Sequence, residues 1–116
     1  MPIVRSPSQL AKARKNARIV RKPEGEAEER ILDIADSNAS LAVDQRLTYD
    51  NIEEAFECYL QNLFDTMDEE HILESPYGFA RDFAYDTYRA RFAQEADRRK
   101  IKVPDALLGI EKRYEE

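Results

Sequence analysis

The single histidine and the single cysteine are the side chains best suited to chemistry in this sequence. His71 follows Asp68 at the i, i+3 spacing seen in di-iron bundles, but such a site needs that motif twice and two further carboxylates. Cys58 would need a base within hydrogen-bond reach to act as a nucleophile, and His71 is the only histidine that could serve. We therefore expect His71 to be a surface residue in an acidic turn and Cys58 to be a small packing residue at the edge of the core.

The acidic clusters do not have the pattern of a catalytic or metal-binding site. Residues 65–70 fail as a calcium loop, because a methionine and a glutamate stand where an EF-hand needs an oxygen ligand and a glycine. Glu53, Glu54 and Glu57 indicate a solvated helix face, because nothing apolar separates them from water. The three glycines are isolated, which excludes a glycine-rich phosphate loop. The sequence thus predicts no catalytic residue, no metal and no cofactor.

The basic residues are concentrated at the N-terminus of a chain of 116 residues with a net charge of −6. Residues 1–22 hold seven of the 18 Lys and Arg and none of the 24 Asp and Glu, so this segment carries +7 and the remainder −13. Such a basic arm indicates a nucleic-acid partner, a solvated arm, or pairing with the acidic body of the same or a neighbouring subunit. The candidate phosphate contacts of the arm are Lys12, Arg14, Lys15, Arg18, Arg21 and Lys22.

The run Pro23-Glu24-Gly25 is the best candidate for a hinge between arm and body. We predict a basic arm over residues 1–22, helical or disordered, and an acidic α-helical domain over residues 23–116. An arginine-rich arm without acidic residues also fits a mitochondrial transit peptide. A cytoplasmic protein that needs no processing fits equally well, and the cytoplasm is the location we expect. No run of about 20 apolar residues is present, so no membrane contact is expected.

Hydrophobic periodicity predicts an all-α fold, a small bundle of about four helices, because apolar residues recur at helical spacing and no run alternates as a strand would. Asp50 and Glu53 have the spacing of a capping box at the start of one helix. The predicted helices cover residues 8–22, 26–43, 50–67, 75–99 and a short stretch after Pro104 that includes Glu111 and Tyr114.

The helix predicted over residues 75–99 carries a wide apolar arc and six of the aromatic residues. A helix this apolar packs between two neighbours or offers one face to a partner. We expect Phe79 and Phe83 to lie in the core. Tyr85, Arg89 and Phe92 form the predicted partner-binding surface, because aromatic residues among charges are typical of protein interfaces.

These observations favour a binding or regulatory protein without enzymatic activity. The first hypothesis is a small inhibitor, antitoxin or anti-activator, of the kind that phages and plasmids encode, whose acidic helical body contacts a protein partner. The second is a nucleic-acid-binding protein that uses the basic arm. The third is a structural subunit that buries its apolar helix in an oligomer, including a homo-oligomer.

Overall fold

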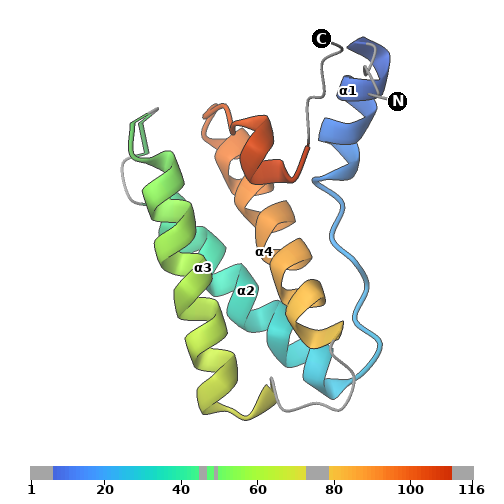
Figure 1. The fold of residues 1–116 in the computed structure, drawn as a ribbon, viewed down its shortest axis with the longest axis vertical. Coiled ribbons are helices and arrows are strands. Elements are labelled where there is room, and N and C mark those ends of the chain that lie inside the picture. Colours follow the sequence, from blue (N-terminus) through green and yellow to red (C-terminus); the bar gives the residue numbers. More distant parts are fainter. Residues whose placement is uncertain (1–6, 45–46, 49, 73–78, 111–116) are drawn as a thin grey trace, which may run out of the picture.

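A computed structural model describes residues 7–44, 47–48, 50–72 and 79–110 of the chain, without the side chain of Phe79. Figure 1 shows that the predicted all-α fold is confirmed: the described residues contain helices and no β-strand. Three long helices lie side by side as a body, and the N-terminal segment runs along one side of it. The elements in chain order are α1 (Pro7–Asn16), α2 (Glu26–Asp44), α3 (Ile52–Glu69), α4 (Phe79–Arg98) and a 3-10 turn, η2 (Asp105–Leu108).

Helices α2 and α4 have the closest backbone contact of any pair in the body. Both helices contribute small buried side chains, which let two helix axes approach each other. These alanines are Ala35, Ala39 and Ala42 on α2, and Ala84, Ala90, Ala93 and Ala96 on α4. Two ion pairs also join these helices: Arg91 Nε lies 2.6 Å from Oδ1 of Asp36, and Arg99 contacts Asp44.

Helix α3 presents larger side chains to the core and stands further from α4. The buried apolar residues of this helix recur at helical spacing along one stripe: Ile52, Phe56, Leu60, Leu63 and Met67. Three aromatic rings fill the space between α3 and α4. The Phe56 centroid lies 5.0 Å from that of Tyr88 and 5.0 Å from that of Phe92, with an edge-to-face angle of 87° to Phe92.

The phenol of Tyr88 is buried among these rings and has a polar partner. Its hydroxyl donates to the backbone carbonyl of Phe56 at 2.7 Å, which ties α4 to α3 inside the core. Burial raises the pKa of Tyr88 well above its ordinary value, because the apolar surroundings disfavour the phenolate.

Polar residues in the middle of α2 do not end the helix, which continues past Ser40 to Asp44. Asn38 is buried, and its side-chain amide donates to the carbonyl of Ile34 at 2.9 Å. Its Oδ1 accepts a hydrogen bond of 2.6 Å from Nδ2 of Asn62 on α3. Asn38 thus links α2 to α3 while both groups of its amide are satisfied within the chain.

The predicted helix over residues 8–22 is too long. Helix α1 ends at Asn16, and residues 19–24 are not helical. Arg18 contacts Asp97 while Arg21 contacts Asp86. Those two aspartates are separated by about 16 Å along α4, whereas three residues of a helical arm would rise only about 4.5 Å. An extended arm rises up to about 3.3 Å per residue, and the long arginine side chains cover the rest of the distance.

The two other predicted helix ends are also corrected. Helix α3 begins at Ile52 instead of following a cap at Asp50, and Asn51 at its start makes no capping bond with its side chain. Oδ1 of Asn51 accepts the Thr48 amide at 2.6 Å instead, which closes the preceding turn. The stretch after Pro104 is the short turn η2, ended by Gly109 at φ +72°. The predicted start of the fourth helix at residues 75–76, and Glu111 and Tyr114, lie outside the described residues.

None of the helices described here is both long enough and apolar enough to cross a membrane.

The buried phenol predicts a loss of stability at alkaline pH. The unfolded chain ionises a tyrosine near pH 10, while burial keeps Tyr88 protonated in the fold. Stability is therefore full below about pH 10 and decreases above it. At neutral pH, Tyr88→Phe should lower the free energy of unfolding by about 1 kcal/mol, because the hydrogen bond is lost. At alkaline pH, the same variant should lack the part of the stability decrease that comes from ionisation of Tyr88 in the unfolded chain. Urea unfolding between about pH 7 and pH 11 measures both effects.

Tyr59→Phe, a substitution of a half-buried tyrosine, is the control, and an equal alkaline decrease in both variants would contradict this account.

Candidate interaction surfaces

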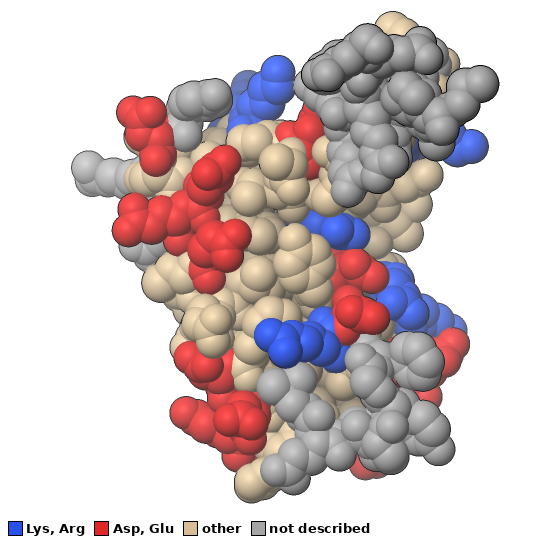
Figure 2. Space-filling view, in the orientation of Figure 1, with Lys and Arg blue, Asp and Glu red and all other residues tan. Residues whose placement is uncertain are grey.

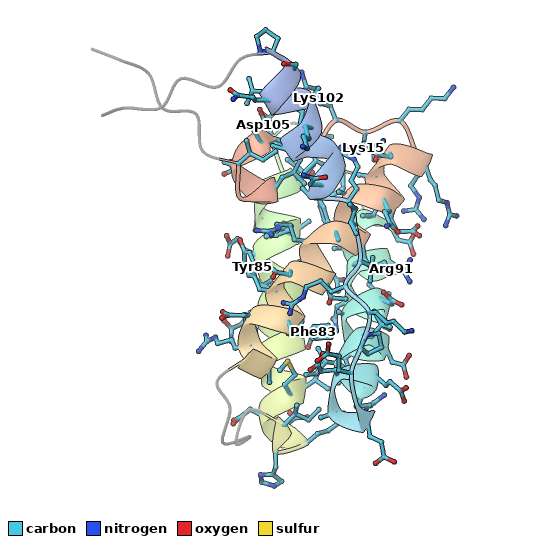
Figure 3. All side chains as sticks on the ribbon, turned by 90° about the vertical axis from the view of Figure 1, so that its right-hand side faces the viewer. Lys15, Phe83, Tyr85, Arg91, Lys102 and Asp105 are labelled. Carbon is cyan, nitrogen blue, oxygen red and sulfur yellow. The ribbon has the colours of Figure 1, made fainter. Side chains whose placement is uncertain are left out.

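The basic arm lies along α4 and is held there by aspartates (Figure 3). Arg14 donates from Nε and Nη2 to the two carboxylate oxygens of Asp105, at 2.9 and 2.8 Å. These hydrogen bonds raise the pKa of Arg14 above its ordinary value. Arg18 makes the same two-pronged contact with Asp97, at 2.5 and 3.1 Å. Paired guanidinium–carboxylate bonds fix the orientation of both groups as well as their distance.

Arg21 extends this contact towards the start of α4. Its Nη1 lies 3.5 Å from Oδ2 of Asp86, and Oδ1 of the same carboxylate accepts a hydrogen bond of 3.0 Å from Arg89. The Arg21 guanidinium also lies 5.5 Å from the ring centroid of Phe83, and that of Arg89 lies 5.2 Å from the centroid of Tyr85. Asp86 therefore joins the arm to Tyr85 and Arg89, two of the predicted partner-binding residues.

Further contacts support the three arginines. Nε2 of Gln94 donates to the backbone carbonyl of Arg18 at 2.7 Å, and Nη1 of Arg18 donates to the carbonyl of Arg14 at 2.6 Å. The apolar side of the arm packs on the core through the partly buried residues Leu10, Ala13 and Ala17. The arm is thus paired with the acidic body, which is one of the alternatives that the sequence left open.

The lysines of the arm are placed differently from its arginines. Lys12, Lys15 and Lys22 are exposed, and none of them forms an ion pair with a described carboxylate. Lys15 is labelled in Figure 3. Of the six candidate phosphate contacts, three are therefore bound to aspartates of the body and three face solvent.

Among the predicted partner-binding residues, the structure places Phe92 in the core instead. Phe92 is 0% exposed, because its position on α4 turns the ring towards Phe56. Phe83 is buried at 2% exposure, as expected for a core residue. Tyr85 and Arg89 are partly exposed. Arg89 packs so closely on Gly109 that a Cβ there would lie 2.3 Å from Nη1 of Arg89.

An open cleft of about 700 Å³ lies where the arm meets α2 and α4. Its charged and aromatic lining consists of Arg21, Lys22, Glu24, Glu28, Asp82, Tyr85 and Asp86. The lining holds two cations and four carboxylates, and its arginine and Asp86 are already paired with each other. The cleft is therefore a mixed-charge surface beside Arg21 and Lys22 of the arm.

Helix α3 carries the second surface, which is acidic. It contains six carboxylates and no Lys or Arg, and all six side chains are exposed. In Figure 2, red side chains gather along the edge of the molecule that α3 forms. A shallow depression of about 290 Å³ beside this acidic surface is lined by Asn51, Glu54, Ala55, Cys58 and Tyr59. The carboxylates of the acidic α3 face are Glu53, Glu54, Glu57, Asp65, Asp68 and Glu69.

Cys58 and His71, which could act together only as nucleophile and base, lie far apart in the structure. They are separated by 13 positions along and just beyond α3, a rise of about 20 Å. Cys58 is exposed on the α3 surface, so the expectation that it packs at the edge of the core is wrong. Within the described parts of the chain, no three His, Cys, Asp or Glu side chains cluster closely enough to hold a metal ion.

The aspartates that receive the arm were missed by the sequence analysis. Asp86 and Asp97 are eleven positions apart, close to three full helical turns, so they lie on one face of α4. That spacing was readable in the sequence. Its pairing with Arg18 and Arg21 was not, because it joins segments 65 and 79 positions apart.

Comparison with models of known protein families, with curated proteins and with solved structures finds no match to this chain. The interpretation of both surfaces therefore rests on their own contacts and charges.

Salt should loosen the arm without unfolding the body. Raising the ionic strength from about 0.01 M to about 1 M shortens the Debye length from about 30 Å to about 3 Å, which weakens exposed ion pairs most. Trypsin should then cleave within residues 12–22 faster, by about tenfold if each of the three ion pairs contributes about twofold. An unstructured arginine peptide corrects for the effect of salt on trypsin itself. Unchanged cleavage after that correction would show that apolar contacts, and not ion pairs, hold the arm.

Proposed function

We propose that this chain is a non-enzymatic binding protein of the cytoplasm, of the inhibitor, antitoxin or anti-activator type. It acts by covering a basic surface of a protein partner with the acidic α3 face. The single observation that carries this proposal is the run of six exposed carboxylates on a helix without any Lys or Arg. Charge complementarity of this kind speeds association and excludes wrong partners.

The carboxylates of the acidic α3 face differ from the aspartates that contact arginines elsewhere in the molecule, because they are not neutralised internally. The α4 aspartates at positions 86 and 97 bind arginines of the arm, and on α2 Asp36 binds Arg91 of α4 while Asp44 binds Arg99, which follows α4. Within the described residues, none of the six carboxylates on α3 forms an ion pair. They remain available for cations of a partner.

The depression on α3 adds a feature that suits a basic partner. Tyr59 is partly buried there beside exposed Glu54. An aromatic ring next to a carboxylate receives a lysine or arginine side chain through charge attraction and cation–π contact together. We infer that a basic side chain of the partner occupies this depression.

The third hypothesis, burial of an apolar helix in an oligomer, is less favoured by the contacts of α4. This helix packs on α2 and α3, and the arm covers a further part of it, as the contacts of Arg21 and Gln94 show. Two copies facing each other through α3 would also repel each other. A monomer that binds a different, basic protein is the arrangement we propose.

Neutralising the acidic α3 face tests the proposal. The variant Glu53→Gln/Glu54→Gln/Glu57→Gln should lose a partner that the native chain retains in stoichiometric amount from cells of its own organism. Its affinity for the purified partner should fall about tenfold or more, because close charge pairs at an interface are removed. Calorimetry with the purified partner measures the change.

A matched variant controls for overall charge. Glu26→Gln/Glu29→Gln/Asp33→Asn removes three exposed charges from α2 and should keep the partner bound. Equal retention by both variants, or equal loss, would refute the assignment of binding to α3.

A further inference from the structure

Two of the arm arginines hold anionic groups that present two oxygens to a guanidinium, as a phosphate also can. Arg14 and Arg18 each hold a carboxylate through two parallel hydrogen bonds. A guanidinium binds a phosphate through the same planar, two-pronged geometry. The aspartates of the body therefore occupy the groups that the arm would use for a nucleic-acid backbone.

We propose that the arm is a nucleic-acid-binding segment which the chain holds in a masked state. Asp86, Asp97 and Asp105 act as internal competitors, and binding to a phosphate backbone exchanges them for phosphates at Arg14, Arg18 and Arg21. The proposal goes beyond the protein contact assigned to α3, because it concerns a different surface and a different class of partner.

The arm has the features that such an exchange requires. The three exposed lysines can contact phosphates first, while the arginines are still bound to the body. The ion pairs of the arm are partly exposed: the side chain of Arg14 is 43% exposed, that of Arg18 27% and that of Arg21 59%. Exposed pairs of this kind contribute at most about a fivefold change in equilibrium each, so a polyanion can displace them.

The position of the arm also fits a nucleic acid better than a membrane or an acidic patch on α3. The arm and α3 lie on opposite sides of the body (Figure 1), so a bound backbone stays away from the six carboxylates. Leu10, Ala13 and Ala17 of the arm pack on the core, and Ile19 is the large apolar side chain that the described part of the arm exposes, which is too little apolar surface to insert into lipid. Residues 1–22 contain no acidic residue that would repel phosphates.

The test measures binding of a labelled DNA duplex of about 20 base pairs at several salt concentrations. The variant Asp86→Asn/Asp97→Asn/Asp105→Asn should bind the duplex about tenfold more tightly than the native chain, because its arginines are released. The gain should be largest at low salt, so the plot of log affinity against log salt should also steepen, because salt screens the ion pairs that mask the arginines of the native chain.

Two controls separate unmasking from a general change of charge. Glu53→Gln/Glu54→Gln/Glu57→Gln changes the net charge by the same amount on α3, and should leave the slope of the salt plot unchanged. The aspartate variant made in a chain that also carries Arg14→Gln/Arg18→Gln/Arg21→Gln should show no gain. Circular dichroism and the thermal midpoint confirm that each variant is folded.

The outcomes decide the proposal. A gain that depends on the three arginines supports it. An equal gain in the α3 variant, a gain that survives without the arginines, or no duplex binding by any folded variant overturns it. A gain for an acidic peptide but none for the duplex also overturns it. None of these results depends on the protein partner of α3, so the two proposals fail independently.

Discussion

Helix α4 has to be covered on several sides at once, and this requirement organises the molecule. Its alanines allow α2 to approach closely, while Tyr88 and Phe92 reach across a wider gap to Phe56 on α3. Burying an aromatic side chain of this kind is favourable by roughly 1.5–3 kcal/mol, so neither neighbour can be lost without exposing a large apolar surface. The hydroxyl of Tyr88 can enter this core because the Phe56 carbonyl accepts its hydrogen bond.

The arm covers a further side of α4 in a different way. Helices α2 and α3 cover two sides of α4 and leave the aspartates of α4 and η2 at the surface. A fourth helix packed on this side would have to bury those aspartates. An extended segment avoids that cost, because its arginines neutralise the aspartates and its contact with α4 is polar along much of its length. The charge asymmetry of +7 against −13 is therefore partly resolved within the folded chain.

Local patterns in the sequence predict the helices of the body well, because spacing along one helix decides which residues are buried. The stripe from Ile52 to Met67 is the clearest case. The same reasoning fails for Phe92, since a helix covered on several sides has no single buried stripe that marks the core. It fails again for the end of α1, because the arm is extended by contacts with aspartates that lie far away in the sequence. Position along one helix was visible, but pairing between distant segments was not.

The two kinds of contact also imply two levels of stability. The core of α2, α3 and α4 is held by buried side chains, whose contribution salt changes little. The arm is held by partly exposed ion pairs and by a few small apolar residues, so it can open at a free energy far below that of global unfolding. A segment that opens alone can exchange its partner while the acidic α3 face keeps its shape. The acidic α3 face is rigid, whereas the basic arm can be released. Because the two are separate, a chain of this size can present both charges without one neutralising the other completely.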